Sequence, residues 1–274
     1  QLVLDMANPD VVEYLYESIS SILRENRIEY VKWDMNRSIS DWYTSVLPAE
    51  RQKEMPHRYV LGVYELLERL TSEFPNVLFE GCSGGGGRFD AGMLYYCPQI
   101  WCSDNTDAHD RTFIQYGTSF FYPASAVGSH VSAVPNHQVY RKTPISTRAN
   151  VAYFGTFGYE LDLNLLSDEE FSQVKEQICF MKKYRELIQI DGDFYRLVNP
   201  FEGNDTAWMV VSQDKKQAVA AFYQRLNKVN ASWLRLKLQG LDPDKQYEVT
   251  YHSGRAHTEP EVVLQAYGDE LMHA

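Results

Sequence analysis

The chain has 274 residues, 44 % of them hydrophobic, and a formal net charge of −11 at pH 7. This composition is typical of a globular protein, and the excess of negative charge argues against nucleic-acid or anionic-membrane partners. No apolar run approaches the roughly 18 residues that a membrane-spanning helix needs. The four cysteines form no C-x-x-C pair, which argues against a zinc site, and we expect reduced thiols and a cytoplasmic location.

The first hundred residues predict alternating helices and strands. The expected elements are a helix at 8–26, a strand at 28–31, a helix at 60–70, a strand at 76–82 and a strand at 99–102. The first helix begins at Asn8-Pro9, an N-cap followed by proline at the first helical position. Residues 1–5 carry no initiator methionine or signal-peptide pattern, so we expect the natural protein to start further upstream.

The second part of the chain continues the alternation and then changes character. We expect a helix at 109–119, a strand at 124–133, a helix at 144–154, a strand at 157–162 and a long helix to about 188. A capping box at Ser167 and Glu170 opens the long helix. From Asp193 onward, short alternating runs predict a small antiparallel β-sandwich, with strands at 208–211, 218–223 and 233–238. We therefore expect two domains, residues 1–192 and 193–274.

Two acids follow two of the predicted strands, and they are the candidate catalytic residues. Asp34 comes directly after the first strand, and Asp104 comes directly after the strand at 99–102. Lys32 lies two residues before Asp34, on the same strand face, so its ammonium is expected to hold Asp34 ionised as a nucleophile requires. A surface salt bridge is the alternative for this pair. Paired carboxylates that face one substrate are the chemistry of glycoside hydrolysis.

A run of four glycines, Gly84 to Gly87, follows the strand between the two acids. Glycine-rich loops can bind phosphate, but no Gly-Lys-Ser/Thr follows this one, so a nucleotide site is not favoured. Close approach of the backbone to a substrate fits the run better. Strand–acid, strand–glycine loop and strand–acid, with helices between them, indicate a (β/α) barrel whose site lies at the carboxyl ends of the strands.

Four sequence blocks resemble the α-galactosidases of glycoside hydrolase family 36. They are Lys32 to Arg37, Cys82 to Asp90, Trp101 to Asp107 and Ser129 to His137. The resemblance implies an α/β fold in which a partial (β/α)8 TIM-type barrel, its N-terminal strands missing, precedes the β-sandwich domain. It implies that the chain is the C-terminal part of a larger enzyme.

The resemblance also implies a role for each site residue. Asp34 is expected to be the nucleophile and Asp104 the general acid/base. Lys32 and Asn36 are expected to bind galactose hydroxyls, and the remaining residues are expected to line the pocket: Cys82, Gly85 and Trp101. Trp101 is either a platform on which the sugar stacks or part of the core.

The expected reaction is retaining hydrolysis of terminal α-linked galactose from oligosaccharides of the melibiose and raffinose type. Neither a cofactor nor a metal is expected, and relatives in the family suggest a homo-oligomer, a tetramer by analogy. Three alternatives stay open: an α-N-acetylgalactosaminidase, a galactosyl transferase of the same family, and a non-catalytic sugar-binding fragment. His130 and His137 could each act as a general base, although structural roles are favoured for both.

Overall fold

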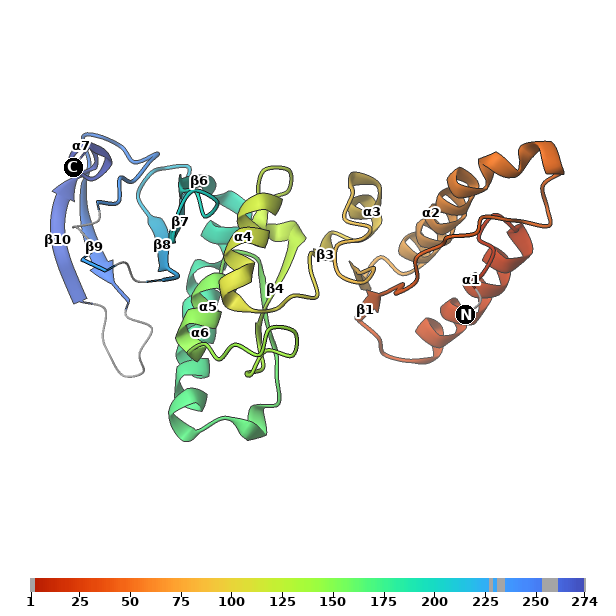
Figure 1. Ribbon diagram of the computed structural model, residues 1–274, viewed down its shortest axis with the longest axis horizontal. Helices are drawn as coiled ribbons and strands as arrows, with labels where there is room; N and C mark the ends of the chain where they lie inside the picture. The colour runs from red at the N-terminus through yellow and green to blue at the C-terminus, as the bar shows by residue number, and fades with distance from the viewer. Residues whose placement is uncertain (1–2, 227–228, 231–234, 253–260, 274) are drawn as a thin grey trace. The chain divides into compact units, whose positions relative to one another are not determined.

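The computed structural model describes residues 3–226, 229–230, 235–252 and 261–273 (Figure 1). The chain divides into two compact units, Gln1–Asp104 and Asn105–Ala274. The first unit contains every residue predicted for the site. No helix among the described residues combines the length and the apolarity that a bilayer crossing requires.

The first unit alternates helices with parallel strands, as predicted. Its elements are α1 (Pro9–Glu25), β1 (Tyr30–Trp33), a 3₁₀ helix (Ala49–Glu54), α2 (Met55–Glu73), β2 (Leu78–Gly81), α3 (Ala91–Tyr96) and β3 (Gln99–Trp101). Strand β2 lies between β1 and β3 and pairs with both in parallel. The register places Lys32 opposite Glu80 and Gly81 opposite Ile100. Because all three strands run the same way, their carboxyl ends meet at one edge.

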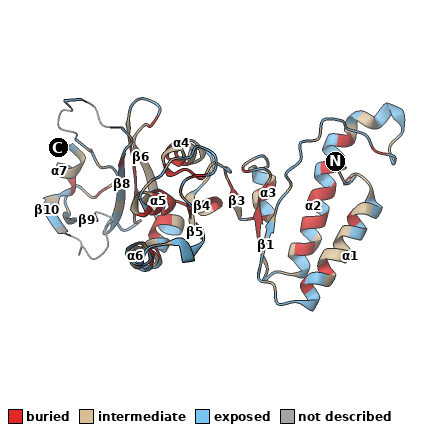
Figure 2. Cartoon of the chain, turned by 60° about the horizontal axis from the view of Figure 1, so that its bottom comes forward, coloured by how far each residue is buried: buried red, intermediate tan, exposed pale blue. Residues whose placement is uncertain are grey.

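Local signals explain where the helices of this unit begin. The Asn8 side chain accepts a hydrogen bond from the backbone N–H of Asp10, with Pro9 next to the cap, so α1 starts where the sequence predicts. Figure 2 shows the buried stripe along α2, where Leu66, Leu67 and Leu70 are fully buried. This stripe and the inner face of α1 pack in one apolar core with β2 and β3. Helix α3 was not predicted.

The second unit begins with the same βα alternation. Its first elements are α4 (Ala108–Thr118), a 3₁₀ turn (Ala124–Ala126), β4 (Val127–Ser132), α5 (Ile145–Ala152), β5 (Thr156–Glu160), a 3₁₀ turn (Leu163–Leu165), α6 (Asp168–Glu186) and a π-helical turn (Leu187–Asp191). Strands β4 and β5 pair in parallel. The predicted capping box is present, since Ser167 and Glu170 bond reciprocally at the start of α6.

Antiparallel strands follow in the same unit. They are β6 (Asp193–Val198), β7 (Asp205–Val211), β8 (Ala218–Gln224), β9 (Gln246–Tyr251) and β10 (Glu261–Tyr267), and α7 (Gly268–His273) comes last. One sheet has the order β6-β7-β8 and the other pairs β9 with β10. Met209 and Val211 of β7 pack in one cluster with Tyr247 of β9, as the two sheets of a sandwich do.

One strand prediction in this region was wrong. The predicted strand at 233–238 is not a strand at residues 235–238, and residues 233 and 234 lie outside the described part of the chain. Leu238 does pack inward, since it joins the cluster around Met209. Burial on one side therefore produced a strand-like pattern without a strand.

Candidate active site

Asp34 lies just beyond the carboxyl end of β1, where its side chain is exposed. The Asn36 amide donates a hydrogen bond to its Oδ2 at 2.8 Å. Burial of part of the carboxyl group would raise the pKa of Asp34. Hydrogen bonds from the Cys82 thiol, the Asn36 amide and the backbone N–H groups of Met35 and Gly84 outweigh it, so that the pKa of Asp34 is lowered. The carboxylate is therefore held ionised, as a nucleophile must be.

Cys82 is the buried partner of this carboxylate. It follows β2, is 4 % exposed, and its backbone N–H donates to the carbonyl of Trp33 at 2.8 Å. Burial, followed by the neighbouring Asp34 carboxylate, raises the pKa of the Cys82 thiol to about 11. The thiol is consequently protonated at neutral pH, and it acts as a hydrogen-bond donor rather than as a nucleophile.

Lys32 has a different partner from the one that its spacing predicts. Its Nζ lies 3.9 Å from Oε1 of Glu80 and 4.9 Å from the centroid of the Trp101 ring. We expected Lys32 to hold Asp34 ionised, but hydrogen bonds from neighbouring donors do so instead. The reason is the register, which places the Glu80 carboxylate beside Lys32 on the adjacent strand.

Asp104, the second predicted acid, is exposed in the loop between β3 and α4. Trp101 fixes one of its oxygens, since the indole Nε1–H donates to Oδ1 of Asp104 at 3.1 Å. Trp101 is 3 % exposed, so within this chain its ring is a buried support for Asp104 and not an open stacking surface. The sequence had left these two roles of Trp101 open.

The glycine loop contacts Asn36, which holds Asp34, and the backbone of Asp104. Gly84 donates its N–H to Oδ1 of Asn36 at 2.8 Å, and Asn36 in turn contacts Asp34. A Cβ atom on Gly85 would lie 2.8 Å from the backbone nitrogen of Asp104, and one on Gly86 would lie 2.6 Å from the carbonyl oxygen of Cys102. Both Gly84 and Gly85 have positive φ, 54° and 84°. The glycines thus allow two backbone segments to approach each other closely.

The structure brings the predicted site residues into two hydrogen-bonded groups at the strand ends of the first unit. Asp34, Asn36 and Gly84 form one chain of hydrogen bonds, and Trp101 with Asp104 forms another. Glu80 is the residue that the sequence reasoning missed. A single charge inside the apolar run of β2 was the signal that could have found it, because such a charge is seldom buried without a partner.

A second group of acidic residues follows Asp104 in the chain. Asp107, His109 and Asp110 could each offer a metal-ligand atom, and these atoms all lie within 4.8 Å of one another. Asp107 caps α4 and is buried, and the Arg141 guanidinium pairs with it and with Asp110, the latter at 3.3 Å. The arginine neutralises the carboxylate charge that would otherwise attract a metal ion. We therefore assign these residues a structural role at the start of α4.

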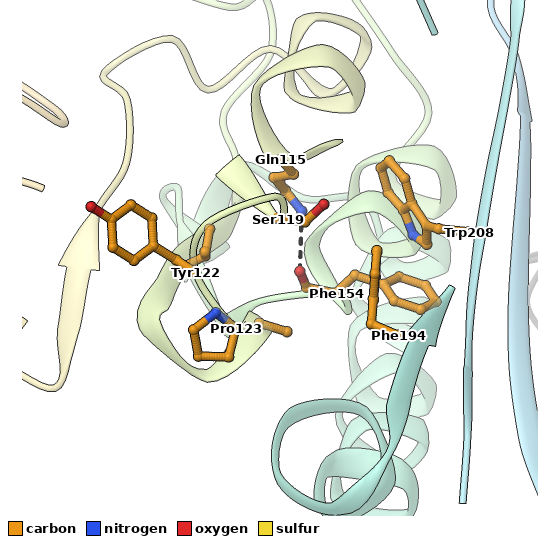
Figure 3. Close-up of a pocket in the computed structure, with 9 residues that line it drawn as sticks. Gln115, Ser119, Tyr122, Pro123, Phe154, Phe194 and Trp208 are labelled. Atoms are coloured by element: carbon orange, nitrogen blue, oxygen red, sulfur yellow. Dashed lines mark hydrogen bonds between the residues drawn. The ribbon is translucent and has the colours of Figure 1, made fainter. Parts of the chain in front are cut away.

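A small cavity lies within the second unit (Figure 3). It is lined by Gln115, Ser119, Tyr122, Pro123, Ala124, Val127, Phe154, Phe194 and Trp208. Its volume is about 70 Å³, room for about two water molecules, whereas ligand sites usually exceed about 300 Å³. None of the predicted site residues lines it, and we regard it as a packing gap between aromatic rings.

Acids that follow parallel strands beside a glycine loop place the chain among the (β/α)-barrel glycoside hydrolases. The Melibiase family profile matches residues 1–191, and the glycosyl hydrolase family 36 C-terminal domain matches residues 205–274. The chain belongs to glycosyl hydrolase family 36, as the four sequence blocks predict.

Curated relatives and solved structures agree with this membership. The chain is 52 % identical to alpha-galactosidase AgaA of Geobacillus stearothermophilus, over 100 % of the chain and 36 % of the relative. It is 49 % identical to alpha-galactosidase Mel36A of Lactobacillus acidophilus, again over 100 % of the chain and 36 % of the relative. The chain therefore spans about a third of the length of these relatives.

A crystal structure of an AgaA variant with raffinose matches the chain with a TM-score of 0.93 at 51 % identity, over 100 % of this chain and 36 % of that one. A second variant, crystallised with stachyose, matches with a TM-score of 0.94 at 51 % identity and the same coverage. These matches confirm the predicted fold class, a partial (β/α)8 barrel followed by an antiparallel β domain.

Proposed function

We propose that the protein carrying this chain is a retaining α-galactosidase that hydrolyses terminal α-linked galactose from oligosaccharides. The observation that carries the proposal is the state of Asp34, an exposed carboxylate at a strand end whose pKa is lowered by hydrogen bonds from its neighbours. A second exposed acid, Asp104, follows β3 and is held by the indole N–H of Trp101. One ionised and one positioned acid are the two groups that retaining hydrolysis uses.

The two acids divide the reaction between them. Asp34 attacks the anomeric carbon while Asp104 gives its proton to the departing glycosidic oxygen, and a covalent galactosyl-enzyme forms. Asp104 then takes a proton from a water molecule, which attacks the same carbon and releases Asp34. Two inversions give net retention of configuration.

The relatives support the assignment of these two residues. AgaA was crystallised with raffinose and with stachyose as two variants, and in each of them a different aspartate is replaced. The two replaced aspartates lie 70 positions apart in that enzyme. Asp34 and Asp104 are separated by the same 70 positions in this chain.

The remaining site residues are proposed to hold the sugar. Lys32 and Asn36 lie beside Asp34 with exposed side chains and could bind galactose hydroxyls. Cys82 and Gly85 are buried beneath the acids and would form the pocket wall. Trp101 would contribute indirectly, because its indole N–H holds Asp104 by a hydrogen bond.

The domain organisation, location and assembly are also proposals. We infer a barrel portion at residues 1–192 and a β domain at 193–274, supported by the change from parallel to antiparallel pairing between β5 and β6. Free thiols at all four cysteines are compatible with a cytoplasmic protein. A homo-oligomer, such as the tetramer expected by analogy, can be tested by light scattering of the intact protein.

The decisive experiment measures p-nitrophenol release from p-nitrophenyl α-galactoside by the full-length protein and its single variants. Asp34→Ala should abolish release, and Asp104→Ala should slow raffinose hydrolysis far more than release from the activated aryl substrate. Asp41→Ala, which removes an exposed acid from the same loop, should behave like wild type. The first-formed galactose, observed by NMR, should be the α anomer.

Other outcomes would lead to the alternatives. A wild-type protein that ignores the galactoside but cleaves the N-acetylgalactosamine analogue would be an α-N-acetylgalactosaminidase. Product dominated by transfer to sucrose would indicate a galactosyl transferase. Sugar binding without turnover would indicate a non-catalytic binding protein, and each of these results would overturn the proposal.

A further inference from the structure

Glu80 is a buried carboxylate for which the proposed reaction has no use. It lies on β2, and its side chain is 3 % exposed, among the most buried of the large side chains in the described chain. Charged side chains are seldom buried so fully unless a specific interaction compensates them. A carboxylate kept at this depth, beside the catalytic loops, therefore points to a task in the site.

The register of the sheet directs Glu80 toward Lys32. The two residues are opposite each other in the parallel ladder of β1 and β2, and Nζ lies 3.9 Å from Oε1. The Lys32 side chain is 39 % exposed, so its ammonium could otherwise turn toward solvent or toward the nearby acids. The buried charge of Glu80 restrains it at one position.

From that position Lys32 lies over the ring of Trp101. Its Nζ is 4.9 Å from the ring centroid, within the range of a cation–π contact. The same indole donates its N–H to Oδ1 of Asp104 at 3.1 Å. Glu80, Lys32 and Trp101 come from three adjacent strands, and their contacts end at the proposed acid/base.

We propose that Glu80 is a positioning residue for Asp104 and acts through Lys32 and Trp101. The proposal rests on the proposed function, in which Asp104 protonates the leaving group. Glu80 keeps the ammonium over the indole, the ammonium holds the plane of the ring, and the indole N–H holds one oxygen of Asp104. The other oxygen then faces the departing glycosidic oxygen.

The test compares two substrates whose leaving groups need the acid to different degrees. Protonation matters when a sugar departs, as in raffinose, and matters little when p-nitrophenolate departs from the aryl galactoside. In the full-length protein, Glu80→Gln keeps the shape of the side chain and removes its charge. We expect it to lower kcat/KM for raffinose about 10- to 100-fold, part of the usual contribution of a general acid, and for the aryl galactoside by less than about 3-fold.

Three further variants keep the test decisive. Glu29→Gln removes an exposed acid next to β1 and should leave both substrates unaffected. Trp101→Phe removes the N–H donor together with part of the buried ring, and it should show the same selective loss as Glu80→Gln. In the double variant the losses should not multiply, because both changes interrupt one path. Thermal unfolding of each variant reports whether it folds.

The outcomes separate the inference from the proposed function. Equal losses on both substrates, or losses that multiply in the double variant, would overturn the positioning role while leaving the α-galactosidase assignment intact. A wild-type protein that hydrolyses neither substrate would instead refute the proposed function. If Glu80→Gln does not fold, a Trp101→Phe variant without selective loss also overturns the inference.

Discussion

Replacing Gly85 by alanine tests whether the glycine loop positions the second acid. Gly85 has a φ of 84°, and its added Cβ would lie 2.8 Å from the backbone nitrogen of Asp104 and 3.0 Å from Cα of Ser103. Both neighbours are backbone atoms, so no flexible side chain can give way. The left-handed conformation costs alanine about 1–2 kcal/mol, and crowding a packed site typically adds about 1–3 kcal/mol. We therefore expect a loss of about 2–5 kcal/mol in the free energy of unfolding.

The same change should impair catalysis, because the collision pushes directly on the residue that carries the acid. A displacement of about 1 Å in a catalytic group can cost about 100-fold in rate. The assays are denaturant unfolding and hydrolysis of raffinose by the full-length protein. Gly203→Ala is the matched control, since a Cβ atom there meets nothing within 4 Å and should change stability by less than about 0.5 kcal/mol. Equal stability and activity of the two variants would refute the reasoning.

Three other outcomes follow from the contacts. Asn36→Ala removes a hydrogen bond that lowers the pKa of Asp34, so this pKa should rise. As the pH is lowered, the variant should therefore lose activity at a higher pH than wild type does, and an unchanged pH–rate profile would contradict this. Iodoacetamide at pH 8 should label the exposed Cys179 and spare Cys82, whose thiol pKa burial raises to about 11, with peptide mass spectrometry as the readout. Gly117→Ala, inside α4 with open space around it, should stabilise the protein by about 0.5–1 kcal/mol, and a lower melting temperature would count against it.

The sequence predicted the helices whose first residues carry a local capping signal. Asn8 before Pro9, and Ser167 with Glu170, satisfy free backbone groups at helix starts, so these boundaries can be read without knowledge of the fold. Helix α3 has only six residues, too few for a periodic apolar pattern. Its signal was Asp90, whose side chain accepts the N–H of Met93 as an N-cap, and a cap alone does not distinguish a helix from a turn.

The position of the candidate residues at the carboxyl ends of the strands could be predicted, but not the partners of each one. Spacing along one strand places Lys32 and Asp34 on the same face and suggests that they pair. The neighbour across the sheet decides otherwise, because β2 presents Glu80 to Lys32 in register. Register between two short parallel strands depends on the packing of both, which a single sequence does not display. Asp34 therefore obtains its low pKa from donors that follow it or come from the next loop.

The glycine loop couples the two acids more closely than their separation in sequence suggests. Gly84 contacts the amide that holds Asp34, and its neighbour Gly85 packs against the backbone of Asp104. One peptide unit thus joins the supports of the proposed nucleophile and the proposed acid/base, so a shift of either glycine should move both. Substitutions on opposite sides of the loop, such as Asn36→Ala combined with Gly85→Ala, should then give rate losses that do not multiply, because residues that share a support are energetically coupled.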